Sequence, residues 1–135
     1  MKEKKTDEHR LYNRNFGDAC KNAFNGIIYG IKSQRNIRIQ LVMAVIIIII
    51  GFIAKLNTFE CIVLTFAIFL VIVAEMINTA IETAVDLCTQ EYHPKAKLAK
   101  DAGAGAVVLA AINALVVAYF LFFDRIVTWV TQLIK

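Results

Sequence analysis

The segment AEMINTAIETAVDLCTQEYHPKAKLAKDAG, residues 74–103, decides how this chain folds. Charged residues end one strongly apolar run and begin the next: Glu75, Glu82, Asp86, Lys100 and Asp101. If these runs cross a membrane, each acidic residue near its middle costs about 2.5–3.5 kcal/mol, and less toward a helix end. Several such residues in one short segment therefore indicate a functional site.

The composition indicates a small integral membrane protein, because 59% of the 135 residues are hydrophobic and only 19% are charged. Three long intervals contain no charged residue: 39–54, 61–74 and 102–123. Only the last reaches the roughly 20 residues that span a bilayer unaided. Arg38 and Lys55 flank the first interval, and their side chains can snorkel to the membrane surface. The second is long enough only if its helix includes the carboxylates from Glu75 onward.

We therefore predict an all-α membrane protein with three transmembrane helices that follow an amphipathic surface helix. Apolar residues recur at helical spacing in the proposed surface helix: Phe16, Cys20, Ala23, Phe24, Ile27 and Ile31. His93 is expected to precede the last helix, and Pro94 fits its first turn. The predicted single domain covers 1–135, with a charged tail at 1–15, the surface helix at 16–36, spans at 37–54, 60–87 and 95–123, and a C-terminal tail at 124–135.

The distribution of basic residues predicts the orientation in the membrane. Of fifteen Lys and Arg, nine precede residue 39, one follows the first span, three follow the second and two follow the third. Because cytoplasmic loops carry an excess of Lys and Arg, the N-terminus and the second loop are expected inside. The first loop and the C-terminus are then outside, which places the charged segment on the cytoplasmic side.

Four polar residues of the second span share one helix face. At about 100° per residue, Glu75, Asn78, Glu82 and Asp86 fall within an arc of about 80°. A structural interpretation is a stripe that holds helices together by hydrogen bonds, although Asn78 and Thr79 do so at lower cost than carboxylates. A functional interpretation is Mg²⁺-dependent phosphoryl transfer, which needs oxygen ligands and a nearby amine. The usual nucleotide-binding motifs are absent from the sequence.

The sequences AEMINTAIETAVD and EYHPKAKLAKDAGAGAV closely resemble the pattern of the bacterial diacylglycerol kinase and undecaprenol kinase family. The resemblance extends more weakly through FNGIIYGIKSQRNIRIQ, and so covers most of the chain. It implies a homotrimer in the bacterial plasma membrane that transfers the γ-phosphate of ATP to the hydroxyl of a membrane lipid. The active sites are then shared between subunits at the cytoplasmic face. No nucleic-acid partner is expected.

The resemblance also implies roles for individual residues. Glu75 would be the general base toward the lipid hydroxyl, Asn78 its polar neighbour, and Glu82 a Mg²⁺ ligand. The positions associated with nucleotide binding are Glu82, Asp86, Lys100, Asp101 and the basic residue Arg14.

One position departs from the family pattern and keeps other functions open. Gln34 stands where the family commonly has a second glutamate ligand for the metal, although an amide oxygen also coordinates Mg²⁺. A non-catalytic membrane scaffold would explain this change, and a cation path would explain the acidic stripe. The near absence of charge in the opposite half of the spans argues against a cation path. RNIRIQ and EYHP favour undecaprenol as the substrate, with diacylglycerol as the alternative.

Overall fold

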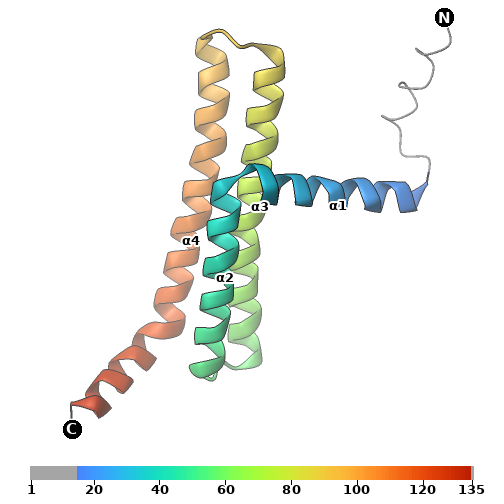
Figure 1. The fold of residues 1–135 in the computed structure, drawn as a ribbon. Helices are drawn as coiled ribbons and strands as arrows, with labels where there is room; N and C mark the ends of the chain where they lie inside the picture. The colour runs from blue at the N-terminus through green and yellow to red at the C-terminus, as the bar shows by residue number, and fades with distance from the viewer. Residues whose placement is uncertain (1–14, 135) are drawn as a thin grey trace, which may run out of the picture. The chain divides into compact units, whose positions relative to one another are not determined.

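The computed structural model describes residues 15–134, which form four α-helices and no strand. They divide into two units, one holding the first helix and the other holding the remaining three (Figure 1). Three helices are long and apolar enough to cross a membrane, which confirms the predicted fold class. In chain order the helices are α1 (Phe16–Ser33), α2 (Arg35–Ile53), α3 (Thr58–Cys88) and α4 (Pro94–Leu133).

The helix α1 begins where Asn15 accepts a 2.9 Å hydrogen bond from the backbone N–H of Asp18. It ends at Ser33, earlier than the predicted end at residue 36. The cause is Gln34, whose extended backbone (φ −105°, ψ 120°) cannot continue a helix and instead precedes the first residue of α2. The role of α1 as a membrane-surface helix stays a prediction.

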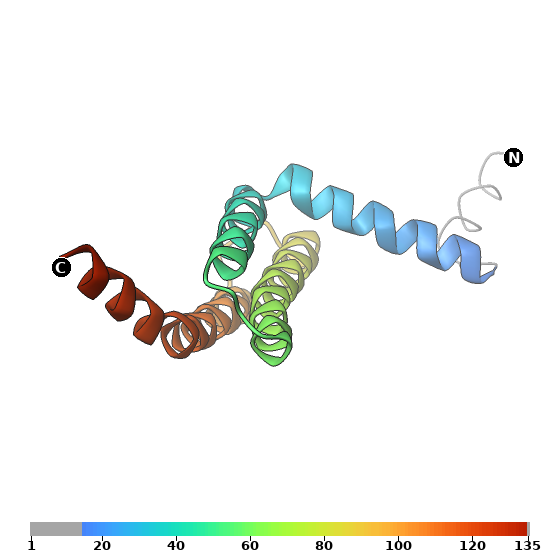
Figure 2. The same ribbon diagram turned by 90° about the horizontal axis from the view of Figure 1, so that it is seen from below.

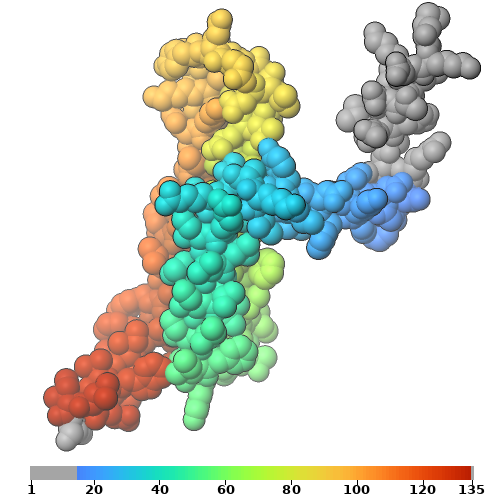
Figure 3. Space-filling view, in the orientation of Figure 1, coloured from blue at the N-terminus to red at the C-terminus, as the bar shows by residue number. Residues whose placement is uncertain are grey.

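The three long helices differ in length, and two of them are longer than is needed to cross a membrane. At 1.5 Å per residue, α2 is about 28 Å long, close to the roughly 30 Å hydrocarbon core of a bilayer. The helices α3 and α4, with 31 and 40 residues, reach about 46 Å and 60 Å. Their hairpin extends well past the start of α2 (Figures 1 and 3). One end of the hairpin therefore lies beyond the level that α2 can span.

Within this unit α3 packs against both other helices, as the end-on view shows (Figure 2). The buried residues of α2 are Ile37, Ala44 and Gly51, spaced seven apart on one face. A Cβ at Gly51 would meet Leu56 at 3.2 Å and Leu64 at 3.3 Å, so the glycine allows close approach. Large apolar side chains remain exposed over the rest of the surface, as expected where lipid surrounds the helices.

The hairpin of α3 and α4 keeps one antiparallel register over most of its length. Near its tip, Lys100 forms an ion pair with Asp86. At the other end, the Arg125 guanidinium bonds both oxygens of Glu60 at 2.9 and 3.0 Å. Between these two pairs, α3 and α4 contain nearly the same number of residues. The two polar contacts thus hold the apolar length between them in register.

The structure corrects the predicted tail at 124–135, because α4 continues as a helix to Leu133. The sequence contains no glycine or proline after Gly105 that would stop it. Arg125 also donates a 2.6 Å hydrogen bond to the carbonyl oxygen of Leu121. The extra turns lean away from the other two helices (Figures 1 and 2).

Both long helices begin with side-chain caps. Asn57 and Glu60 form a reciprocal capping box at the start of α3. At the start of α4, the His93 ring accepts a 3.3 Å hydrogen bond from the backbone N–H of Lys95, and Pro94 occupies the first turn. The predicted roles of His93 and Pro94 are confirmed.

Glu60 both pairs with Arg125 and caps the start of α3, which predicts an order of stability for two variants. Glu60→Ala removes the ion pair and the Glu60 half of the capping box at the start of α3. Arg125→Ala removes the ion pair and the hydrogen bond to Leu121 but leaves the start of α3 capped. We expect thermal unfolding in detergent to show a larger decrease for Glu60→Ala. Asp124→Ala, at an exposed neighbouring carboxylate, is the matched control and should unfold like the unchanged protein. Equal effects of the two variants would contradict a contribution from the cap.

Candidate functional site

Glu75 is the most deeply buried charged residue of the described chain, with 3% of its surface exposed. Its Oε2 atom accepts a 3.3 Å hydrogen bond from Nε2 of Gln40 on α2. A buried carboxylate is costly unless hydrogen bonds compensate for its lost hydration. Gln40 is not among the site residues predicted from the sequence, although it is the only polar residue between Arg38 and Lys55. A single polar residue within a long apolar run is the sequence feature that could have indicated a site residue here.

Asn78 fixes the position of Glu82 one turn later on α3. Its Nδ2 donates a 2.9 Å hydrogen bond to Oε1 of Glu82, and the asparagine itself is 8% exposed. On the other side of the amide lies Gly103 of α4, where a Cβ would come within 2.5 Å of the Asn78 Oδ1. The glycine thus leaves room for the amide, and the amide holds one oxygen of Glu82. The other oxygen of that carboxylate remains available.

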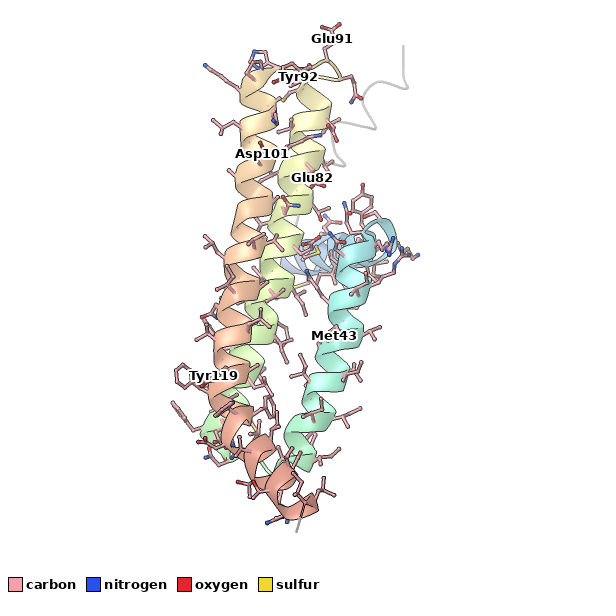
Figure 4. The ribbon with its side chains drawn as sticks, turned by 90° about the vertical axis from the view of Figure 1, so that its left-hand side faces the viewer. Met43, Glu82, Glu91, Tyr92, Asp101 and Tyr119 are labelled. Atoms are coloured by element: carbon pink, nitrogen blue, oxygen red, sulfur yellow. The ribbon has the colours of Figure 1, made fainter. Side chains whose placement is uncertain are left out.

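A pocket of about 290 Å³ lies at the tip of the hairpin. Three predicted nucleotide-binding residues, Asp86, Lys100 and Asp101, line it together. Lys100 is paired with Asp86 here, so its ammonium group is already held inside the pocket. Other lining residues, which include Tyr92 and Lys97, are not among the predicted site residues. Figure 4 shows Glu82 and Asp101 along the two helices and Tyr92 near the tip.

The hydrogen bond between Gln40 and Glu75 fixes the level of each site residue relative to α2. Gln40 is five residues past Arg35, so Glu75 lies about 7 Å inside the start of α2. Asp86 is eleven residues further along α3, about 16 Å closer to the tip. The pocket residue is therefore beyond α2, whereas Glu75 lies within the apolar part of the bundle.

The same comparison places Gln34 near the level of Glu82. Gln34 is about 9 Å from Gln40 along the axis of α2. Glu82 is about 10 Å from Glu75 along α3, in the same direction. Gln34 occupies the N-cap position of α2, but its side chain forms no cap hydrogen bond. Its oxygen is not committed to that helix end. Arg14 lies outside the described residues.

An apolar groove of about 280 Å³ begins beside Gln40 and lies among α2, α3 and α4. Small residues of α4, such as Ala111, Ala114 and Ala118, make room for it. Within residues 15–134, α2 packs on α3 but makes no close backbone approach to α4. Met43, labelled on α2 in Figure 4, also lines the groove. The hydrogen bond between Gln40 and Glu75 therefore lies at one end of the apolar groove.

The oxygen ligands at this level suit a Mg²⁺ ion that also binds phosphates. Residues 15–134 contain no cluster of three or more acidic, histidine or cysteine side chains that could hold a metal. Mg²⁺, however, is commonly bound by one or two carboxylates together with substrate phosphates and water. The free oxygen of Glu82 and the uncommitted oxygen of Gln34 meet that smaller requirement.

The fold and site define a small helical membrane protein whose acidic site lies near one end of its spans. Residues 21–122 match the family model described as prokaryotic diacylglycerol kinase. The chain belongs to this family, and is therefore a lipid kinase. A kinase of this family uses ATP as the phosphoryl donor.

Relatives with two different lipid names match this chain. It is 43% identical over 96 residues to the diacylglycerol kinase of Synechocystis, covering 70% of this chain and 55% of that protein. It is 33% identical over 119 residues to the undecaprenol kinase of Bacillus subtilis, covering 88% of this chain and 97% of that protein. The chain thus matches little more than half of the first relative but almost all of the second.

The contact between Gly103 and Asn78 predicts unequal effects at two nearby glycines. Gly103→Ala should turn the Asn78 amide, break its bond to Glu82, and lower lipid-kinase activity by at least about tenfold. Gly105→Ala is the matched control, because a Cβ there meets nothing within 4 Å. It should keep activity and stabilise α4 by about 0.5–1 kcal/mol. Activity assays and thermal unfolding of both variants test this, and full activity of Gly103→Ala would contradict it.

Proposed function

We propose that this chain transfers the γ-phosphoryl group of ATP to the hydroxyl of undecaprenol. The observation that carries the proposal is the buried carboxylate of Glu75 beside the polar end of an apolar groove. A lipid alcohol has a matching shape, with one hydroxyl at the end of a long apolar chain. Part of that chain fits the groove, and the hydroxyl then lies near Glu75.

Each proposed role follows from the position of a side chain. Glu75 accepts the hydroxyl proton as the lipid oxygen forms its bond to the γ-phosphorus, while the bond to the β-phosphate oxygen breaks and ADP leaves. Asn78 positions Glu82 through its amide. Lys100 donates hydrogen bonds to phosphate oxygens from the pocket at the tip, where its neighbours Asp86 and Asp101 orient the nucleotide. Arg14 is proposed as a further phosphate contact.

Mg²⁺ is the proposed cofactor, with Glu82 and Gln34 as its protein ligands. When bound, it would offset the negative charge of the ATP phosphates. One carboxylate and one amide carry less charge than two carboxylates, so a weaker hold on the ion is expected. The donor set of Glu82 and Gln34, both oxygen atoms at one level of the bundle, supports this assignment.

The choice of undecaprenol rests on coverage as well as on local sequence. The relative named undecaprenol kinase is matched over 97% of its length, and RNIRIQ and EYHP resemble that branch. The relative named diacylglycerol kinase has the higher identity over a shorter part of its length. Diacylglycerol is therefore the competing substrate, and both lipids must be assayed side by side.

The site is proposed to face the cytoplasm, where ATP is available. The excess of Lys and Arg before residue 39 and after the second span supports an inside N-terminus and an outside C-terminus. A homotrimer with active sites shared between subunits is proposed from the family resemblance. Exposed apolar residues on all three long helices leave surface for such contacts as well as for lipid.

The role of Glu75 is tested with an isosteric change. Glu75→Gln keeps the shape but removes the base, and should lower kcat by about 10²- to 10⁴-fold without loss of folding. The purified full-length chain is assayed in detergent micelles with ATP, Mg²⁺ and either undecaprenol or a diacylglycerol, and the phosphorylated lipid is measured. Asp124→Asn is the control at an exposed carboxylate.

The outcomes separate the class of reaction from the choice of lipid. If the unchanged protein phosphorylates neither lipid, the proposed function is wrong. A higher kcat/KM for diacylglycerol would reverse the substrate choice and leave the lipid kinase in place. Full activity of Glu75→Gln would remove Glu75 as the base.

The metal assignment predicts a gain from restoring charge. Gln34→Glu should lower the Mg²⁺ concentration needed for half-maximal activity, because a carboxylate binds the ion more strongly than an amide oxygen. A titration of activity against Mg²⁺ measures the change, with Gln132→Glu at the far end of α4 as the control. An unchanged requirement in Gln34→Glu would show that the second ligand charge at this position does not limit metal binding.

A further inference from the structure

Gln40 is a polar residue in an otherwise apolar membrane helix. If α2 served only to cross the membrane, an apolar residue would serve equally well at this position. It is the single polar side chain between Arg38 and Lys55, and it is partly buried against α3. Placing an amide in an apolar bundle costs free energy unless it gains hydrogen bonds. Its Nε2 donates one such bond, 3.3 Å long, to Oε2 of Glu75.

The rest of the Gln40 amide has no structural partner in the described part of the chain. Its Oε1 is buried and accepts no hydrogen bond there. A residue that only tied helices together would be expected to use both ends of its amide. The contact to Glu75 is thus the one interaction that residues 15–134 show for this side chain.

Gln40 also marks the point where the apolar groove ends. It lines the groove together with Met43 and Ala44 of α2, and Ile72 of α3 lies one turn before Glu75. A chain lying in this groove therefore meets Gln40 at its polar end, and Gln40 is hydrogen-bonded to Glu75. No other described side chain donates a hydrogen bond to the Glu75 carboxylate.

We propose that Gln40 is a positioning residue for phosphoryl transfer. Its N–H holds Oε2 of Glu75, so that the carboxylate keeps one orientation and its Oε1 stays free for the proton of the lipid hydroxyl. Gln40 itself exchanges no proton and forms no bond to phosphorus. The inference rests on the proposed role of Glu75 as the base, and it adds a residue from within α2 to the proposed site.

A purely structural role would have a different signature. A hydrogen bond that merely joined α2 to α3 would change stability when removed and leave the rate of the chemical step unaltered. A positioning role changes kcat, because a misplaced base loses transition-state contacts while the nucleotide still binds at the distant hairpin tip. Kinetics, nucleotide binding and unfolding must therefore be measured on the same variants.

The test uses Gln40→Met, which keeps the side-chain length but has no N–H, and Gln40→His, whose neutral ring can still donate one. Full-length protein in micelles is assayed with ATP, Mg²⁺ and undecaprenol, and ATP binding is measured separately by calorimetry. We expect Gln40→Met to lower kcat by about 10- to 100-fold, the range found when a metal-binding side chain loses its hydrogen-bond partner. The KM for ATP and the ATP affinity should stay unchanged, and Gln40→His should recover most of kcat. Gln132→Met is the control for the same substitution at an exposed site.

Three results on the variants would contradict the proposed role of Gln40. Unchanged kcat in Gln40→Met, or equal losses in Gln40→Met and Gln40→His, would show that the N–H does not matter. Loss of ATP binding or of folding in Gln40→Met would show that Gln40 is structural. Failure of the unchanged protein to phosphorylate any lipid would instead reject the proposed function, and this result is distinct from an active protein that tolerates Gln40→Met.

Discussion

The site depends on the close contact between Gly103 of α4 and the amide of Asn78 on α3. Because the glycine has no Cβ, the Asn78 side chain fits between the two helices and reaches Glu82. This contact lies between the two polar pairs that hold the hairpin in register, Lys100 with Asp86 and Arg125 with Glu60. A larger residue at this point would displace the Asn78 amide and release the Glu82 oxygen that it holds.

The unequal lengths of the helices separate the chemistry into two environments. The short helix α2 matches the apolar thickness of a bilayer, while α3 and α4 continue beyond it. Glu75 lies within the range of α2 and beside the groove, where a lipid can reach it. Asp86 and Lys100 lie past the start of α2, where a charged nucleotide can bind without entering the apolar region. Phosphoryl transfer between a lipid and ATP requires that combination.

Much of the fold could be predicted because the relevant signals are local. Apolar runs and helix caps such as His93 with Pro94 depend on neighbouring residues, and both predictions are confirmed. The helix α4 continues past the predicted boundary at residue 123, and Arg125 beyond that boundary pairs with Glu60, far away in sequence. The grouping of Asp86, Lys100 and Asp101 is seen in one pocket, and Asn78 contacts Glu82 as helical spacing suggests. The chemical roles of these residues remain proposals.

The sequence by itself determined the helices, their apolar faces and the acidic stripe on α3, because each follows from the composition and spacing of residues along one segment. It also carried the family pattern that indicates a lipid kinase. Only the tertiary structure decided which side chain of α2 meets Glu75, because an almost uniformly apolar helix has no periodicity that reveals its buried face. The pairing of Gln40 with Glu75, the groove beside them and the room left by Gly103 all arise from contacts between helices, which no single segment encodes.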